Sequence, residues 1–280
     1  MTRSETPPLA WRLGAHIAVY AVALTMILPF AWMVLTSLKS DQEAAGLGGF
    51  RVLPAEWRWE NYALAFEAAQ LDRFYLNSLI VAVATTLLAV AHNALAGFAF
   101  AKMRFRGRRL LFGLALVTMM LPVQVFFIFA YVIAHRLGYI DDLRGLIVPF
   151  LASGFGVFYM RQAIAAVPDS LLDAGRIDGM GDWELFWNVT RPAVWPAITA
   201  LAIFTFVNSW NSFFWPLIAV DRLEFKTLPL ALADLASGNY IQSWPQRMAA
   251  ATILVLPLIV VFFFAQRAFI RGVTLTGMKE

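Results

Sequence analysis

The side chains with the most evident binding chemistry lie in one apolar run, Asn208 to Pro216. The amides of Asn208 and Asn211 are three residues apart and are predicted to share a helical face, with Trp210 beside them. Amides hydrogen-bond to hydroxyl groups, and indole rings stack on the C–H faces of sugars. These three residues are therefore candidates for a solute pathway. Two alternatives stay open: amides also join membrane helices to one another, and Trp215 also fits an aromatic belt at the bilayer surface.

A second group of candidates lies in the polar segment 163–191. Asp169 or Ser170 could cap a short helix, because Asp173 follows Ser170 by three residues as in a capping box. Gly179 supplies the left-handed turn that ends such a helix. A patch of this kind fits a groove of another protein or, alternatively, the membrane surface. The apolar residues of the patch are Leu171, Leu172, Ala174, Gly175 and Ile177.

The same segment predicts a second short helix, which starts at Asp182 and is stopped by Pro192.

Other functions, namely catalysis, metal binding, nucleotide binding and nucleic-acid binding, have no residues to support them. The chain has no cysteine, and its His, Asp and Glu residues show no metal or acid–base spacing, so an enzyme is not expected. None of the four lysines lies in a G-x-x-x-x-G-K-[ST] loop, so nucleotide binding is expected on another chain. The net charge of +4 is spread over short loops, which argues against a nucleic-acid partner.

The composition places these candidates in a membrane protein. Of the 280 residues, 60% are hydrophobic and only 14% are charged, whereas about a quarter of a soluble domain is charged. A bilayer core about 30 Å thick needs roughly 20 apolar helical residues per crossing. Six stretches qualify and predict an all-α membrane protein with six transmembrane helices. These are residues 13–38, 74–101, 110–134, 143–162, 192–220 and 246–266, and the core of the fold is expected over about 74–266.

The segments between the crossings predict the topology. They are an N-terminus over 1–12, outer loops over 39–73 and 221–245, a basic hinge over 102–109, the polar loop over 163–191 and a tail over 267–280. Six crossings place both termini on one side, which holds 13 Lys and Arg against 9 on the other, with net charges of +6 and −2. The positive-inside rule therefore predicts that both termini are cytoplasmic.

The crossings contain no Asp, Glu, Lys or Arg between their flanking charges, and His92 is the one ionisable group well inside a crossing. Carriers coupled to protons or ions usually hold charged groups at mid-membrane. The driving energy is therefore expected to enter from outside the bilayer. For His92, a hydrogen bond between helices is favoured over a proton relay.

The polar loop resembles the EAA loop of permeases from binding-protein-dependent ABC importers, whose pattern is E-A-A-x-x-D-G followed by I-x-L-P. The spacing matches throughout, but Asp173 replaces Glu, Gly175 replaces Ala and Arg191 replaces Leu. Asp173 is one methylene shorter than Glu, and Gly175 is expected to loosen the helix by about 0.5 to 1 kcal/mol relative to Ala. The resemblance is carried by Asp173-Ala174-Gly175, Asp178-Gly179 and Val189-Thr190-Arg191-Pro192.

Further stretches resemble the carbohydrate branch of these permeases, the maltose and glycerol-3-phosphate type, over nearly the whole chain. The resemblance implies the type I ABC importer permease fold with both termini inside. The stretches are Pro29 to Met33, Thr36 to Lys39, Asn61-Tyr62, Asn77 to Ile80, Ala99 to Phe105, Leu121 to Gln124 and Gln266 to Lys279.

The resemblance also implies partners and residue roles. The chain would hold no cofactor, with ATP and Mg on a partner ATPase. It would assemble in the inner membrane of a bacterial or archaeal cell with a second permease, two ATP-binding subunits and an extracytoplasmic solute-binding protein. Tail residues Gly277 and Lys279 would contact the ATPase. The coupling residues would be Asp173, Ala174, Gly175, Arg176, Asp178 and Gly179.

Three questions stay open at this point. The outer-loop aromatics Trp57, Trp59, Tyr240 and Trp244 fit contact with a binding protein as well as an ordinary membrane interface. The same architecture could import a non-sugar solute, such as a polyamine or a phosphorylated compound. An ATP-independent secondary carrier could also work as a dimer of six-span halves.

Overall fold

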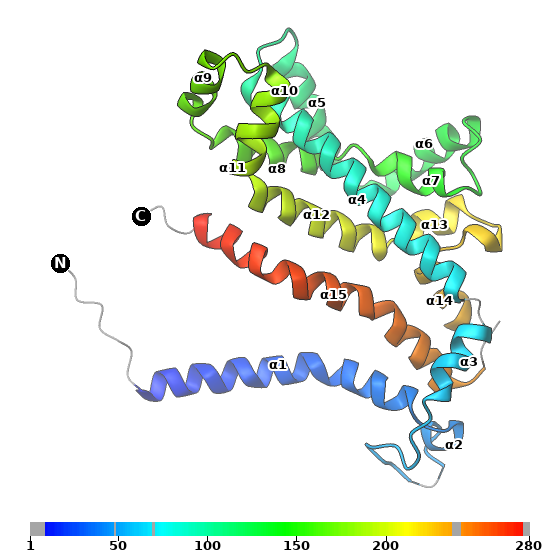
Figure 1. Cartoon of the computed structure of the whole chain (residues 1–280). Helices are drawn as coiled ribbons and strands as arrows, with labels where there is room; N and C mark the ends of the chain where they lie inside the picture. The colour runs from blue at the N-terminus through cyan, green and yellow to red at the C-terminus, as the bar shows by residue number, and fades with distance from the viewer. Residues whose placement is uncertain (1–8, 48, 69–70, 237–241, 277–280) are drawn as a thin grey trace. The chain divides into compact units, whose positions relative to one another are not determined.

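The computed structural model describes residues 9–47, 49–68, 71–236 and 242–276, and every regular element among them is a helix. The expected all-helical membrane fold is confirmed. The chain forms two compact units, one from residues 1–71 and 234–255 and the other from 72–233 and 256–280. Figure 1 shows the path of the helices along the chain.

The first unit begins with the apolar helix α1 (Leu9–Ser37), followed by α2 (Asp41–Ala44) and α3 (Glu60–Ala68). The side-chain amide of Asn61 donates to the carbonyl oxygens of Ser37 and Lys39, at 2.8 and 2.9 Å. These bonds fold the loop that follows α1 back onto the end of that helix. Helix α14 (Leu228–Ala236) and the long helix α15 (Trp244–Thr276) cross the boundary between the units.

The second unit holds both groups of candidate residues. It begins with the long helix α4 and continues through a series of shorter helices. In order these are α4 (Leu71–Lys102), α5 (Arg108–Met120), α6 (Val123–Arg136), α7 (Leu143–Ile147), η1 (Val148–Phe150), α8 (Gly154–Ala165), α9 (Asp169–Ile177), α10 (Asp182–Glu184), η2 (Leu185–Thr190), α11 (Arg191–Ala193), α12 (Trp195–Trp210), α13 (Phe214–Ala219) and η3 (Leu223–Phe225).

Three of the described helices, α1, α4 and α15, are long and apolar enough to cross a membrane, and the number rises to six if each bent pair of helices counts as one crossing. The expected crossing over 110–134 is not one continuous helix. Helices α5 and α6 meet at 110°, because Pro122 cannot continue the backbone ladder and holds Leu121 extended, at φ −93° and ψ 137°. The expected crossing over 192–220 is also interrupted, between Trp210 and Phe214.

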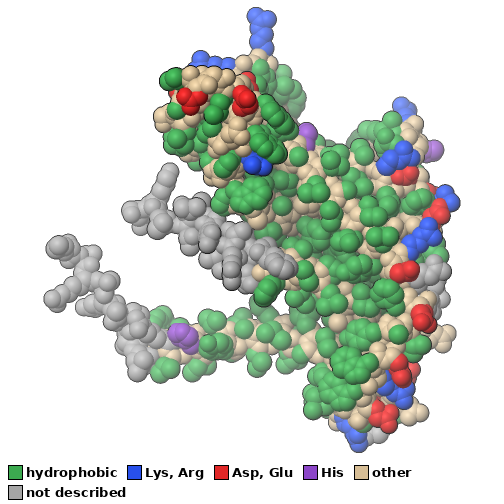
Figure 2. Space-filling view, in the orientation of Figure 1, with side chains coloured by type: hydrophobic (Ala, Val, Ile, Leu, Met, Phe, Trp, Pro, Cys, Tyr) green, Lys and Arg blue, Asp and Glu red, His purple; other side chains and the backbone are tan. Residues whose placement is uncertain are grey.

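Helices α4 and α8 approach each other closely through one glycine on each. A Cβ on Gly97 would lie 2.7 Å from the Cβ of Met160, and one on Gly156 would lie 2.6 Å from the Nδ2 of Asn93. Small residues at such crossings let helix backbones pack tightly inside a membrane. Figure 2 shows hydrophobic side chains over much of the visible surface, as expected for a membrane protein.

Candidate functional site

The first candidate site is a helical knob, which we define as residues 167–194. Its helix α9 begins at Asp169, after Pro168, and its N-terminus receives no side-chain cap. The expectation that Asp169 or Ser170 caps the helix is therefore wrong. The Oδ1 atom of Asp169 instead accepts a hydrogen bond of 2.6 Å from Nζ of Lys102. This bond and the charge of Lys102 lower the pKa of the Asp169 carboxyl group below its ordinary value.

The predicted apolar patch of α9 is divided between two faces. Leu172, which is 1% exposed, and Gly175 point inward, whereas Leu171 and Ile177 are 50% and 87% exposed. A Cβ on Gly175 would lie 2.6 Å from Cδ2 of the buried Leu185. An alanine at this position would therefore push the end of the Leu185 side chain aside, and the expected loosening of the helix by Gly175 stays a prediction. The outward stripe consists of Leu171, Ala174 and Ile177, spaced three residues apart.

The end of α9 follows the sequence prediction. Gly179 has a φ of +84°, and the amide of Met180 donates to the carbonyl of Gly175 at 2.9 Å, which closes the helix. Asp173 and Arg176 form an exposed ion pair of 2.8 Å on the outer surface. The predicted coupling residues are therefore brought together on the exposed side of α9, except for Gly175, which packs inward.

The sequence predicted that the second helix of the knob stops at Pro192, but the helix continues past that residue. Helices α10, η2 and α11 run on from Asp182 to Ala193, and η2 is a π-helical turn. The chain then turns at Val194, so this stretch meets α12 at 82°. Pro192 is tolerated because it stands at the start of α11, where a missing backbone donor costs little.

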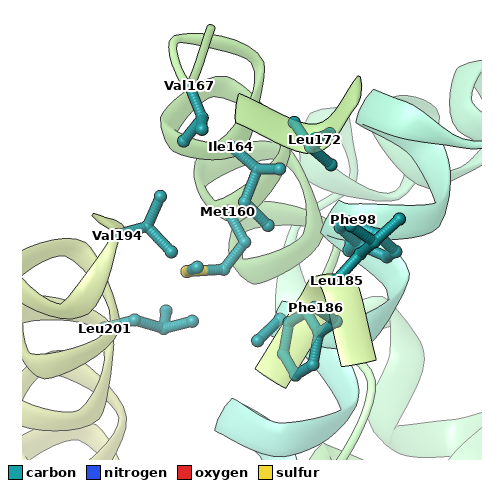
Figure 3. Packing of buried hydrophobic residues seen from close by; sticks show 10 residues of the cluster. Phe98, Met160, Ile164, Val167, Leu172, Leu185, Phe186, Val194 and Leu201 are labelled. Atoms are coloured by element: carbon teal, nitrogen blue, oxygen red, sulfur yellow. The ribbon is translucent and has the colours of Figure 1, made fainter. Parts of the chain in front are cut away.

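A cluster of buried side chains joins the knob to three long helices (Figure 3). Leu172 and Leu185 are each 1% exposed, and the ring of Phe186 meets that of Phe98 on α4 edge to face, at 5.5 Å between centroids. The knob is therefore a packed extension of the unit rather than a loose connector. The helical partners in the cluster include Ala94 and Phe98 of α4, Met160 and Ile164 of α8, and Leu201 of α12.

The second candidate site is a cavity of about 440 Å³, lined by α4, α6, α7, η1, α8, α12 and α13. Its lining has eleven apolar and eight polar residues, and we call it the polar cavity after those eight. No described residue that lines it is charged. The hydroxyl groups of Thr85 and Thr227 are buried and have no hydrogen-bond partner among the described residues. Its polar residues are Thr85, Asn93, Ser153, Thr205, Asn208, Ser209, Ser212 and Thr227, and its aromatic residues are Phe127, Phe150, Phe155, Phe204 and Trp215.

Of the three predicted pathway residues, only Asn208 lines this cavity. Trp210 is 1% exposed and packs against the rings of Phe206 and Tyr75, so it belongs to the core. Asn211 lies exposed at the end of α12, where its amide donates to the carbonyl of Val207 at 2.9 Å. The structure does not bring Asn208 and Asn211 together on one wall.

The alternative interpretation of Trp215, as part of an aromatic belt at the bilayer surface, is wrong. Its side chain is 1% exposed, and its indole N–H donates to the carbonyl of Gly145 at 2.9 Å. The ring lies close to those of Phe127 and Phe150, with centroids 5.6 and 5.9 Å away. Trp215 therefore anchors α13 to α7 and forms part of the cavity wall.

The cavity residues of α4 were missed by the sequence analysis. Thr85 and Asn93 are two turns apart on one face of an apolar helix, and this spacing was the available signal. Asn93 is buried, and its Oδ1 accepts a hydrogen bond of 3.2 Å from the amide of Ser153. His92 lies exposed on α4 instead, so the interhelical bond expected of His92 is made by its neighbour.

The other predicted contact residues lie outside these two sites. Gly277, Lys279 and Tyr240 lie outside the described residues. In the outer loop, Trp57 and Trp59 are 52% and 66% exposed, with their rings stacked at 6.3 Å. Trp244, at the start of α15, is 52% exposed.

The helices, the knob and the uncharged cavity define an all-helical membrane transport component. Residues 93–275 match the family described as the binding-protein-dependent transport system inner membrane component, and the chain belongs to this family. It is thus a multi-pass permease subunit of a transport system rather than an enzyme.

Curated relatives match along almost the full chain. The chain is 32% identical to the arabinooligosaccharides transport system permease protein AraQ of Bacillus subtilis, over 96% of this chain and 99% of that protein. It is 30% identical to the lactose transport system permease protein LacG of Rhizobium radiobacter, over 89% and 90% of the two chains.

A solved structure confirms the fold. A chain of a bacterial ABC transporter involved in the import of the acidic polysaccharide alginate matches with a TM-score of 0.80 at 20% identity. The match covers 95% of this chain and 100% of that one. The expected ABC importer permease fold is therefore confirmed.

Proposed function

We propose that this chain is a permease subunit of an ATP-driven importer for an uncharged carbohydrate or a related polyol. The single observation that supports this cargo is the polar cavity, which combines hydroxyl and amide groups with aromatic rings and holds no charge among its described residues. Such a lining suits hydroxyl groups and the C–H faces of sugar rings. AraQ and LacG, by their names, belong to transport systems for neutral sugars.

The uncharged lining also bears on the alternative cargoes. A polyamine would need carboxylates along its path, and a phosphorylated solute would need Lys or Arg, because an unpaired charge is costly away from water. The described lining provides neither. The exposed amide of Asn208 instead provides hydrogen-bonding groups that a passing polyol can satisfy.

The energy for transport enters through the knob. The outward stripe of Leu171, Ala174 and Ile177 exposes apolar side chains on a helix whose opposite face is packed. An exposed apolar stripe beside Asp173 and Arg176 suits the cleft of a partner protein. In this proposal the partner is the ATPase, which carries the ATP and Mg, and the knob and both termini are cytoplasmic.

The complete transporter would contain this chain, a second permease, two ATP-binding subunits and an extracytoplasmic solute-binding protein. ATP binding would close the ATPase pair and carry the docked knob with it. Because the knob is packed against α4, α8 and α12, its movement would reach the helices that line the cavity. The cavity would then open alternately to each side of the membrane.

The docking role is tested with Ile177→Asp, which places a charge on the outward stripe at a side chain that is 87% exposed. Since Ile177 contributes little to the core, the chain should still fold and insert. Copurification of the ATPase should fall about tenfold or more, as for a central interface residue. Ile177→Leu is the matched control and should retain the ATPase. Normal copurification and uptake by Ile177→Asp would reject docking through this stripe.

The cargo is tested with the assembled transporter and its binding protein in proteoliposomes. Unlabelled neutral oligosaccharides and polyols should compete for uptake of a labelled neutral sugar, whereas polyamines and sugar phosphates should not. Uptake should require ATP on the side of the vesicle membrane where the ATPase lies. Competition by a charged solute would overturn the proposed cargo, and uptake without ATP by this chain alone would favour the secondary carrier.

A further inference from the structure

We propose that Lys102 is a positioning residue, which ties the start of α9 to the end of α4 and so transfers movement of the knob to α4. Lys102 is the last residue of α4, and its side chain is only 7% exposed. Its ammonium group donates to the carbonyl of Val167 and to Oδ1 of Asp169, both at 2.6 Å. The inference rests on the proposed docking of the knob to an ATPase.

The position of these bonds makes Lys102 the polar link at this end of the knob. Helix α9 has no side-chain cap at its N-terminus, where Pro168 precedes Asp169. Its inward face is held further along by the packing of Leu172 and Gly175 against Leu185. The ammonium group of Lys102 is thus the polar contact between the first turn of α9 and α4, beside the apolar packing of Val167 and Leu172. Loss of that group would remove the polar contact while the apolar cluster stayed intact.

A buried ammonium group is a poor means of gaining stability. Removing a lysine side chain from water is costly, and solvent screens the ion pair because its partner Asp169 is 79% exposed. What the ammonium group does provide is a short tether, because it donates charge-assisted bonds to the carbonyl of Val167 and the carboxylate of Asp169 at the same time. The charge on Asp169 is maintained, since Lys102 lowers the pKa of its carboxyl group. We therefore assign Lys102 to orientation of α9.

The main experiment substitutes Lys102→Met in the assembled transporter, in proteoliposomes with the binding protein and a labelled neutral sugar. The ATPase should still copurify, because the outward stripe is unchanged. Sugar taken up per ATP hydrolysed should fall about fivefold or more, in the range of ordinary coupling between sites. Lys102→Arg, which keeps a charged donor, should restore most of the ratio. A normal ratio in Lys102→Met would overturn the proposal.

The matched control is Arg104→Met in the same hinge. Arg104 is exposed and forms no ion pair with the described residues, so its loss removes the same charge without freeing α9. The ratio should stay normal, and a loss equal to that of Lys102→Met would overturn the proposal by showing that charge alone is responsible. Asp169→Asn, at a side chain that is 79% exposed, leaves folding intact and should lower the ratio less.

A second measurement is independent of the ATPase. The chain has no cysteine, so Arg106→Cys and Leu171→Cys create two unique sites for spin labels, one on the hinge and one on α9. Lys102→Met should broaden the distance distribution between the labels, and an unchanged distribution would overturn the proposal. If the wild-type knob failed to bind an ATPase, the proposed function would fail while this distance measurement still tested the tie.

Discussion

The knob packs against α4, α8 and α12, which also line the polar cavity, but the two regions differ in what fills the space between the helices. Helix α4 supplies Phe98 to the packed cluster of the knob and Thr85 to the wall of the cavity. Leu201 of α12 belongs to both. Around the knob, apolar side chains fill the space between the helices, as Figure 3 shows. At the other site the same helices leave about 440 Å³ open.

This difference separates two physical requirements of a transporter. A segment that transmits movement must be close-packed, because packed side chains shift together whereas a void absorbs the displacement. A site that a solute crosses needs open space and polar groups that are not already paired. The exposed amide of Asn208 meets the second requirement, and the buried Leu172 and Leu185 meet the first.

The largest predicted effect comes from opening a void inside the knob. Leu185→Ala removes a side chain that is 1% exposed and lies beside Gly175. We expect a loss of about 2–5 kcal/mol in the free energy of unfolding, as for buried leucines elsewhere. The midpoint of thermal unfolding of the purified chain in detergent, followed by tryptophan fluorescence, measures this loss.

The matched control for that prediction is Ile177→Ala. It also removes an aliphatic side chain from the knob, but this one is 87% exposed, so stability should change by no more than about 0.5 kcal/mol. Its effect should fall on ATPase binding instead. Equal melting points for the two variants would contradict the view that the inner face of α9 is packed and the outer face is free to dock.

Sequence alone was sufficient for the features that depend on local chemistry. The apolar stretches predicted a helical membrane fold, and Gly179 predicted the left-handed turn that closes α9. The break after Met120 also had a local cause in Pro122, but the long apolar run around it favoured a single helix. The mean hydropathy of such a run is an average over its residues, so it does not show where a helix bends.

The features that the sequence did not reveal depend on partners far along the chain. In a mostly apolar chain the inner and outer faces of a helix have similar composition, so periodicity could not place Trp210 in the core or Trp215 on Gly145. Gly175 stands where the motif has Ala, and its close contact with Leu185 depends on how η2 folds back. Likewise, the bond from Lys102 to Asp169 spans 67 residues.

The next largest effect should appear in the cavity, with the opposite signature. Asn208→Leu removes an exposed amide that lines the cavity, so the free energy of unfolding should stay nearly constant. Uptake of a neutral sugar should fall about two- to tenfold, the value of one hydrogen bond to a solute. Melting points and initial rates of uptake in proteoliposomes measure the two effects.

Thr205→Val is the control for this variant, since Thr205 also lines the cavity but its hydroxyl already donates to the carbonyl of Leu201 at 2.8 Å. Its effect on uptake should therefore be smaller. If Asn208→Leu destabilised the chain as much as Leu185→Ala does, the cavity would be an ordinary part of the core, and the contrast between the two regions would disappear.

The smallest effect concerns pH and distinguishes the regions by their charges. The carboxyl pKa of Asp169 in the folded chain lies below its ordinary value, chiefly because Lys102 donates a hydrogen bond to it. The ion pair therefore contributes its full stabilisation above the ordinary carboxyl pKa of about 3.9 and loses it as the pH falls through the lowered value. Since Asp169 is 79% exposed, solvent screens the pair and the contribution is small.

The difference in melting temperature between the wild type and Asp169→Asn should accordingly be constant from about pH 6 to 8 and shrink below about pH 4. The described lining of the cavity holds no charged residue, so the difference between the wild type and Asn208→Leu should not vary over the same range. A difference for Asp169→Asn that changed between pH 6 and 8 would mean that another group controls the link between α4 and α9.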